Sequence, residues 1–376
     1  ATDPSLSQLV QALLGVHGSG PGCIRLHVAG DKTHCGKTTI ALGLLGALYR
    51  AGVPASKLAY IKPATQCEAP DLLVRWCAAK GIDYVGGTDA PLVFYSGFTR
   101  DFMAGNQGTS AEWVKEIRDA VNKLAIGKSF VLVDGVGFPG VGSCVGVSNV
   151  EVAKAARAPV VLVGKSGVGG AIDAYSLNSS FFKTAGVPVL GGIFNFGALD
   201  GFYKWDLCQD QIRSFFAQRR ERESVYGVLP ESEQLAGVRE SVPDMQTDRC
   251  LELAELNIDH VAASLDVSSI LLDAALDPWN RHTMPIKEML GRIGWRELNG
   301  LSNGYSNGYA KGYSNGSSSA SASAPSSAAS SSAARRSEGG KVRAAAAQPA
   351  AAAPSSKRAR RDAVQSQAKA KGASGG

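Results

Sequence analysis

The chain has 376 residues, 44% of them hydrophobic, and a formal net charge of +6, which fits one large or two ordinary globular domains. From residue 299 onward, eleven Lys/Arg against two Asp/Glu give +9, which leaves −3 for the rest of the chain. Seven scattered cysteines with no C-x-x-C pair argue against a disulfide framework or a zinc ribbon, and no apolar run is long enough to span a membrane.

Residues 1–22 are predicted to hold a short N-terminal helix. Asp3-Pro4 is typical of an N-cap followed by proline at the first helical position, and leucines at helical spacing come next. We expect this helix to pack on the body of the protein and to end in the glycine-rich segment 18–22.

The most informative stretch is Gly30-Asp31-Lys32-Thr33-His34-Cys35-Gly36-Lys37-Thr38. It lies between an apolar strand-like run, Ile24–Ala29, and a helical pattern, Thr39–Arg50. A glycine-bounded turn in this position aims backbone N–H groups and the positive helix end at one point. Lys37 adds a mobile cation and Thr38 a hydroxyl suited to magnesium. The stretch predicts a phosphate-binding loop for ATP or GTP, with five rather than four residues between its glycines.

Strands and helices alternate from residue 23 to about residue 235. Several strand-like runs are continuously apolar, as strands covered on both faces are. A capping box, Thr109 with Glu112, predicts the start of one helix. The order predicts an α/β fold with a doubly wound, mostly parallel sheet, whose strand ends bind ligands. The runs after the first are 58–61, 130–133, 160–163, 189–194 and 225–229.

An acidic residue ends one of these runs. Asp134 follows the apolar residues 130–133 and precedes Gly135-Val136-Gly137. A carboxylate at this place completes a magnesium site with Thr38, whereas the alternative is an aspartate that caps a turn or helix. The glycines favour the magnesium site because they let the backbone approach a γ-phosphate closely.

The C-terminal part of the chain is predicted to form a helical appendage and a tail. Residues 236–298 indicate two or three short helices that lie against the sheet. Residues 299–376 have repeated Ser-Asn-Gly-Tyr units and Ser/Ala/Pro-rich sequence, so we expect a disordered, basic, low-complexity tail. Its run Lys357–Arg361 is a nuclear-import address, a polyanion contact or a solubilising charge run. Because aromatic residues are not interleaved with these charges, specific nucleic-acid binding is not predicted.

Taken together, the motifs resemble those of dethiobiotin synthetases. That family belongs to a wider P-loop class with cobyric-acid-synthase and MinD/ParA-type ATPases, and the resemblance covers roughly residues 23–235. It implies a P-loop NTPase fold with ATP and Mg²⁺ as cofactors. The matching stretches are the nine-residue loop 30–38, Lys62-Pro63, Asp134–Gly137, Gly164–Ile172 and Gly192–Asn195.

The resemblance also implies roles for single residues. Lys62 would hold an anionic substrate group, a carbamate in that family, and Asp134 stands where the family usually has Glu. Asn195 would bond the base edge, and Leu229-Pro230 would flank the base. The implied catalytic residues are Lys37, Lys62 and Thr33. The implied metal ligands are Thr38 and Asp134. The implied nucleotide-binding residues are Gly30, Asp31, Lys32, His34, Cys35, Gly36, Lys37, Thr38, Thr39, Asn195, Leu229 and Pro230.

Departures from the family leave three functions open. The loop lacks Thr-Asp-Thr-Glu-Val, and residues 64–68 replace the family's Ser/Gly turn. Lys32 stands where MinD/ParA-type ATPases place a lysine that reaches a partner subunit's nucleotide; the alternative is a solvated loop lysine. His34 either adjusts the charge beside the phosphates or is a loop histidine that faces solvent. Cys35 either fills a small space in the loop or is a thiolate with a lowered pKa.

The first hypothesis is an ATP- and Mg²⁺-dependent, ligase-type enzyme that acts on a small carboxylate or carbamate. The second is a nucleotide-switched, dimerising ATPase that acts on a protein partner, and the third is a structural protein with bound nucleotide. We expect a small-molecule substrate, a homodimer and no membrane contact. We expect an intracellular, cytoplasmic location, while import through Lys357–Arg361, or an organelle after loss of a transit peptide, stays open.

Overall fold

The computed structural model describes residues 6–11, 23–66, 71–220, 222–236, 242 and 245–280. The chain divides into two units, Ala1–Ser302 and Asn303–Gly376, and every described residue lies in the first. Residues 6–11 are helical, as predicted for the N-terminal segment. The predicted tail, with its run Lys357–Arg361, lies outside the described residues.

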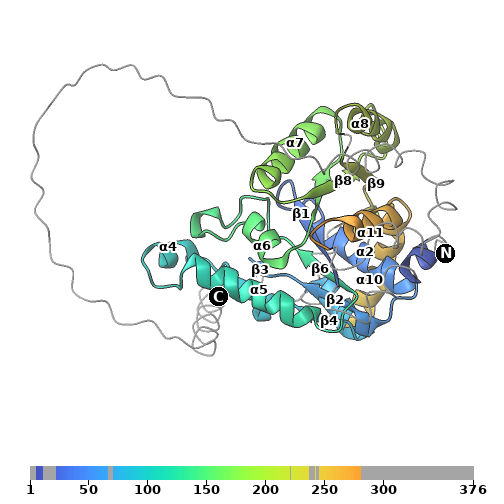
Figure 1. The fold of residues 1–376 in the computed structure, drawn as a ribbon. Coiled ribbons are helices and arrows are strands. Elements are labelled where there is room, and N and C mark those ends of the chain that lie inside the picture. Colours follow the sequence, from blue (N-terminus) through green and yellow to red (C-terminus); the bar gives the residue numbers. More distant parts are fainter. Residues whose placement is uncertain are drawn as a thin grey trace, which may run out of the picture. The chain divides into compact units, whose positions relative to one another are not determined.

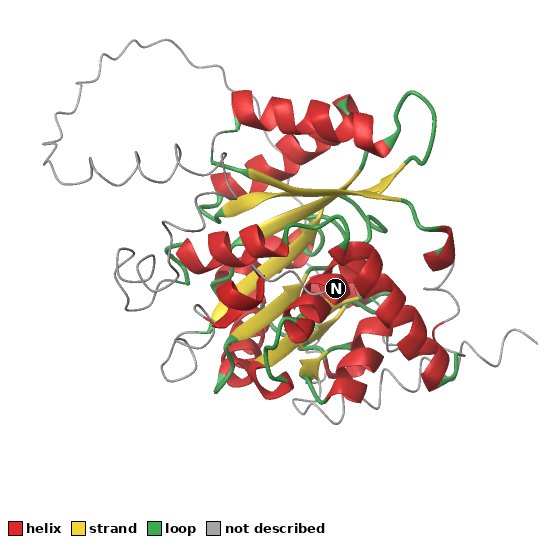
Figure 2. Cartoon of the chain, turned by 90° about the vertical axis from the view of Figure 1, so that its right-hand side faces the viewer, coloured by secondary structure: helices red, strands yellow, loops and turns green. Residues whose placement is uncertain are grey.

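A seven-stranded sheet lies at the centre of the first unit, and all its neighbouring strands run parallel, in the order β4-β2-β6-β1-β7-β8-β9. Figure 2 shows it as a twisted layer with helices on both sides. Two short strands, β3 (Ala64–Thr65) and β5 (Leu92–Val93), pair separately. The strands of the main sheet are β1 (Ile24–Gly30), β2 (Leu58–Ile61), β4 (Asp83–Val85), β6 (Phe130–Asp134), β7 (Val160–Lys165), β8 (Val189–Gly197) and β9 (Ser224–Pro230).

Helices cover both faces of the sheet (Figure 1). One face packs against α2 (Lys37–Arg50), α3 (Leu72–Lys80), α10 (Thr247–Ala262) and α11 (Val267–Leu276). The other packs against α5 (Ser110–Ala125), α6 (Asn149–Ala156), α7 (Gly169–Thr184) and α8 (Trp205–Arg219). The remaining helical segments are α4 (Phe98–Met103) and the 3₁₀ turns Ala55–Lys57, Gly87–Asp89, Ser143–Val145 and Glu233–Leu235.

Alternation along each strand divides the core between these two faces. In β6, Phe130 and Leu132 join the cluster under α2, whereas Val131 and Val133 join the cluster under α5. Both faces are therefore apolar, which is why this strand reads as an uninterrupted hydrophobic run. Burying each such side chain contributes about 1.5–3 kcal/mol, so the apolar runs that signalled the strands also stabilise the sheet.

The described part of the predicted appendage is helical and belongs to the main core. Ile258 and Val261 of α10 are fully buried, and a Cβ added at Gly46 or Gly43 of α2 would lie 2.4 or 2.3 Å from them. The two glycines therefore let α10 approach α2 closely. The boundary predicted between residues 235 and 236 stays a prediction.

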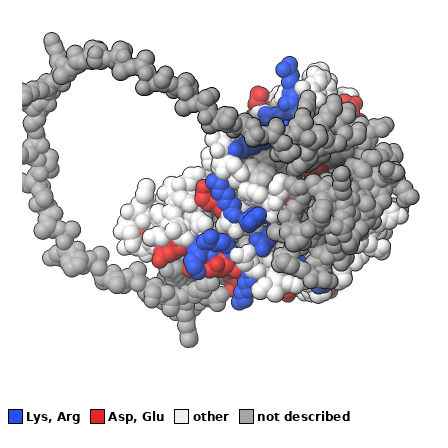
Figure 3. Space-filling model, in the orientation of Figure 1, with Lys and Arg blue, Asp and Glu red and all other residues white. Residues whose placement is uncertain are grey.

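The doubly wound, mostly parallel α/β fold is confirmed, and each predicted strand-like run lies in a strand. Strand β4 at the sheet edge was not predicted, because Asp83 and Tyr84 are exposed and polar and give no apolar run. None of the described helices is both long and apolar enough to cross a membrane. Figure 3 shows both basic and acidic side chains on one face of the described residues.

Candidate functional site

The loop 30–38 joins β1 to α2 at the carboxyl edge of the sheet. Gly36, at the N-cap of α2, has φ 87° and no side chain caps the helix start, so the first-turn N–H groups are left for another acceptor. A Cβ at Gly36 would lie 2.1 Å from the Asn195 amide nitrogen, and one at Gly30 would lie 2.5 Å from the Cys35 sulfur. A side chain at either position would force a neighbouring side chain to move, and the left-handed φ adds a second reason for glycine at Gly36.

Lys37 is a buried cation at the centre of this loop. Its side chain is 8% exposed, and its Nζ lies 4.0 Å from the Cys35 sulfur. No carboxylate pairs with it within 4.0 Å among the described residues. Burial raises the pKa of the Cys35 thiol, so Cys35 stays neutral and acts as the predicted small filler. An anionic ligand can therefore form a charge-assisted contact with Lys37 without competing with a carboxylate of the described residues.

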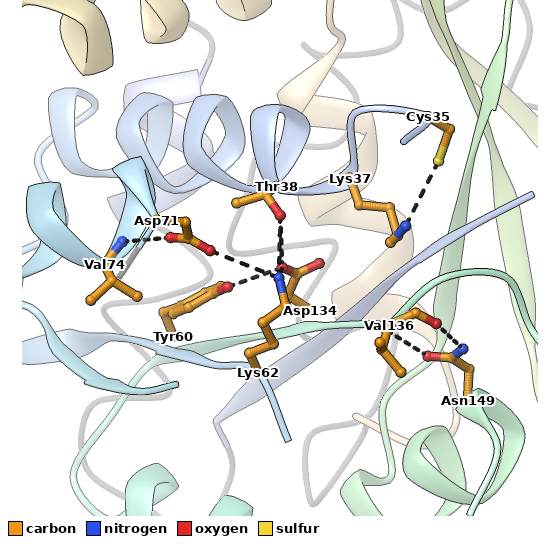
Figure 4. A network of polar contacts seen from close by, with 10 residues as sticks. All are labelled: Cys35, Lys37, Thr38, Tyr60, Lys62, Asp71, Val74, Asp134, Val136 and Asn149. Atoms are coloured by element: carbon orange, nitrogen blue, oxygen red, sulfur yellow. Dashed lines mark hydrogen bonds and ion pairs between the residues drawn. The ribbon is translucent and has the colours of Figure 1, made fainter. Parts of the chain in front are cut away.

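Four side chains meet at the ends of β2 and β6 (Figure 4). Asp134 Oδ2 accepts hydrogen bonds from Thr38 Oγ1 at 3.1 Å, from Tyr60 OH at 3.0 Å and from Lys62 Nζ at 3.1 Å. Burial and the neighbouring Asp134 carboxylate raise the pKa of Tyr60 well above its usual range, so its phenol donates. The predicted pair Thr38 and Asp134 is therefore in direct contact, and the predicted substrate lysine lies beside it.

The residues present fit a magnesium ion. Oxygens that are adjacent ligands at about 2.1 Å from an octahedral ion lie about 3.0 Å apart, close to the 3.1 Å between Thr38 Oγ1 and Asp134 Oδ2. Asp134 is fully buried, and its Oδ1 has no hydrogen-bond partner among the described residues. No group of three His, Cys, Asp or Glu in the described part forms a metal cage. Such an ion would be held by few protein ligands together with phosphate and water, as Mg²⁺ commonly is.

The loop that follows Asp134 is held by Asn149 at the start of α6. Asn149 Oδ1 accepts from the Val136 N–H at 3.1 Å, and its Nδ2 donates to the carbonyls of Val136 and Phe138 at 2.8 Å each. Gly137 has φ 59°, and Thr33 Cγ2 lies 3.7 Å from where its Cβ would be. The turn therefore faces the phosphate-binding loop in a fixed conformation.

The residues predicted to contact a base lie on β8 and β9. Asn195 is 2% exposed, and its Nδ2 donates to the Cys35 carbonyl at 3.2 Å, so its amide group braces the phosphate-binding loop. Leu229 is fully buried in the core and is not available to a base in this conformation. Pro230 is half-buried and is the one member of the predicted pair with accessible surface. The base contacts of Asn195 and Pro230 stay predictions.

The remaining loop residues differ in exposure. The Asp31 side chain is 4% exposed, and burial raises its pKa. The Lys32 side chain is 50% exposed with its Nζ 3.9 Å from Asp31. Thr33 and His34 are exposed, and His34 has φ 59°. Thr39, in the first turn of α2, accepts a hydrogen bond from Asn257 through its carbonyl at 2.9 Å.

Three residues at this site were not predicted from the sequence. Tyr60 and His27 lie inside strand-like runs where no motif marks them, and Asn149 follows the strand–loop segment without a motif of its own. His27 is fully buried on β1, opposite Val133 of the neighbouring strand that ends in Asp134. Burial lowers the pKa of His27 to about 4, so its ring is neutral.

Comparisons with known proteins identify the family. A family model described as "AAA domain" matches residues 25–239, which is more than half of the chain. No curated protein sequence matches significantly. Among solved structures, the apo McdA of a Cyanothece species is 12% identical, with a TM-score of 0.36, and covers 64% of this chain and 98% of its own. The ATP complex of a single-substitution variant of Cyanothece McdA is 14% identical, with a TM-score of 0.39, and covers 71% and 100%.

These two structural similarities are too weak to carry an argument about function. The family match spans the phosphate-binding loop, the strand that ends in Asp134 and all seven strands of the central sheet. The chain therefore belongs to the AAA domain family and is a P-loop NTPase.

Proposed function

We propose that the chain binds ATP with Mg²⁺ and transfers the γ-phosphoryl group to a small carboxylate or carbamate, in the manner of dethiobiotin synthetases. The observation that carries this proposal is the position of Lys62. Its ammonium lies 3.1 Å from Asp134 and 3.5 Å from Thr38, the two residues that would hold the metal in this proposal. A cation in this position can hold an acceptor anion near the γ-phosphate.

In this proposal each side chain acts by position and charge. Lys37 and the N–H groups at the start of α2 bind the phosphates, and Thr38 and Asp134 hold the metal. Mg²⁺, when bound, neutralises phosphate charge and polarises the γ-phosphoryl group. Lys62 orients the acceptor oxygen, so the residues lower the barrier by alignment and electrostatic stabilisation.

The reaction in the dethiobiotin synthetase pattern balances without a further reagent. An oxygen of the carbamate attacks the γ-phosphorus, the bond to the β-phosphate oxygen breaks, and ADP leaves. A second amine of the same substrate attacks the carbonyl carbon of the mixed anhydride, loses a proton and expels inorganic phosphate. Ring closure results. With a separate amine, the same steps give a ligation.

The test is phosphate release from ATP with and without diaminopelargonate plus bicarbonate, followed by a panel of small diamines and amino acids. The proposal predicts substrate-stimulated release that Lys62→Met abolishes while nucleotide binding remains. Slow, substrate-independent turnover with tightly co-purified nucleotide would contradict it and favour a structural role for the nucleotide.

Lys32 supports a second candidate, a nucleotide-switched ATPase that forms dimers and acts on a protein partner. Its side chain is half exposed and only loosely paired with Asp31 at 3.9 Å, so its ammonium can leave that partner at little cost. This candidate predicts ATP-dependent dimerisation, measured by sedimentation velocity, that Lys32→Ala abolishes. A monomer–dimer balance indifferent to ATP would remove it.

A further inference from the structure

Lys62 lies against the two side-chain oxygens that would hold a metal in the proposed function. Its Nζ lies 3.1 Å from Asp134 Oδ2 and 3.5 Å from Thr38 Oγ1, the same two oxygens that fit a magnesium ion. Because Asp134 is fully buried, its carboxylate needs a cation close by to offset desolvation. The Lys62 ammonium supplies that charge in the structure described here.

A second carboxylate lies within reach of the same ammonium. Asp71 Oδ2 is 3.8 Å from Lys62 Nζ, and Figure 4 shows the ammonium between Asp71 and Asp134. Asp71 is fixed at the N-cap of α3, where it accepts a hydrogen bond from the Val74 N–H at 3.0 Å. Its side chain is 31% exposed, so it tolerates the loss or gain of a partner more easily than the buried Asp134.

We propose that Lys62 is the resident cation of the Thr38–Asp134 metal site, and that a divalent ion displaces it toward Asp71. Thr38 Oγ1 contacts Asp134 Oδ2, so a metal that takes both of these oxygens shares Oδ2 with the ammonium, and the two positive charges repel each other in a buried site. The exchange rests on the proposed function. It sets Lys62 free to hold the acceptor anion only after the metal is in place, which couples metal loading to substrate binding.

The exchange predicts opposite effects for two substitutions. Lys62→Met removes the competing charge while it keeps the length of the side chain, so we expect the Kd for Mn²⁺ to fall roughly tenfold. Asp71→Asn removes the carboxylate that receives the ammonium, so we expect that Kd to rise about threefold. Asparagine is as good an N-cap as aspartate, so α3 keeps its start in this variant.

The measurement is Mn²⁺ binding by electron paramagnetic resonance on the full chain, with and without ADP. Lys57→Met is the matched control, because Lys57 precedes β2 and bonds the Gly127 carbonyl at 3.1 Å, at the end of that strand away from Lys62. We expect its Kd for Mn²⁺ to stay within about twofold of the wild type. Thermal unfolding and metal-free ADP binding check that each variant is folded.

An unchanged or higher Kd in Lys62→Met would overturn the proposal, as would an unchanged or lower Kd in Asp71→Asn. Failure of the wild-type chain to bind ADP or ATP at all would instead overturn the proposed function. The arms without nucleotide would still decide whether Lys62 competes with the metal, so the two failures are distinguishable.

Discussion

Replacing Tyr60 with phenylalanine removes one hydroxyl group from a fully buried side chain and leaves its volume almost unchanged. The hydroxyl donates to Asp134 Oδ2 at 3.0 Å. The substitution therefore tests a single hydrogen bond to the carboxylate, without a cavity and without a change of net charge.

The expected magnitude follows from the partners that remain. A hydrogen bond to a charged group contributes about 1.5–3 kcal/mol, and Thr38 and Lys62 still donate to the same oxygen. We therefore expect Tyr60→Phe to lower the free energy of unfolding by about 2 kcal/mol. For a domain of this size that corresponds to a fall in Tm of about 4–8 °C. Because outer hydrogen bonds orient metal ligands, we also expect Mg²⁺ affinity in the presence of ADP to fall about tenfold.

The chain offers a matched control in Tyr226, which is 1% exposed and whose hydroxyl donates to the buried Asp273 Oδ2 at 2.6 Å. Urea unfolding is expected to give a similar loss of stability for Tyr226→Phe, whereas calorimetric titration of Mg²⁺ into the ADP complex should give an unchanged Kd. Wild-type stability of Tyr60→Phe, or equal Mg²⁺ affinity of the two variants, would show that the Tyr60 hydroxyl does not support the Asp134 carboxylate.

Three further substitutions probe the loop and the sheet beneath it. Lys37→Met should reduce ATP binding at least about 100-fold, measured with a fluorescent ATP analogue, because a buried charge-assisted contact is lost; binding within tenfold of the wild type would contradict this. Gly36→Ala should also lose binding, because its φ of 87° disfavours a side chain and its Cβ would lie 2.1 Å from the Asn195 amide; retained binding would show that the loop can adjust. The pKa of His27 is about 4 in the folded chain, whereas its ordinary value is 6.5. As the pH falls, the unfolded chain therefore binds a proton at His27 before the folded chain does. The free energy of unfolding falls by roughly 3 kcal/mol between pH 6.5 and pH 4. His27→Leu should remove this fall in the free energy of unfolding, measured by urea unfolding between pH 6.5 and pH 4. The same pH dependence in the variant and the wild type would contradict this.

Much of the fold was predictable because this sheet is covered on both faces. Strands such as β6 are apolar at every position until Asp134, and such runs need no alternation to be recognised. Strand β4 was not predictable in the same way, since its register with β2 depends on pairing rather than on an apolar run. The packing of α10 into the core also depends on tertiary contacts, at Gly43 and Gly46, that no local pattern reveals.

At the site, the residues that could be predicted from the sequence are those that belong to a motif. The contact between Thr38 and Asp134 follows from a loop and an acidic strand end at adjacent positions of one sheet edge. Tyr60 lies inside a strand-like run that carries no motif, and only the structure places its hydroxyl on the carboxylate. Leu229 was expected beside a base, but it is fully buried in the core cluster that packs against α2. Local sequence indicates the chemistry of a side chain more readily than the neighbours toward which that side chain points.

A crystal structure of the chain with Mg²⁺ and a non-hydrolysable ATP analogue would show the metal and the phosphates in place. We expect one ion bound between Thr38 Oγ1 and the Asp134 carboxylate, Lys37 on the β- and γ-phosphates, and Lys62 withdrawn from Asp134. An ion that contacts neither residue, or a triphosphate bound away from the loop 30–38, would show that Thr38 and Asp134 do not form the metal site.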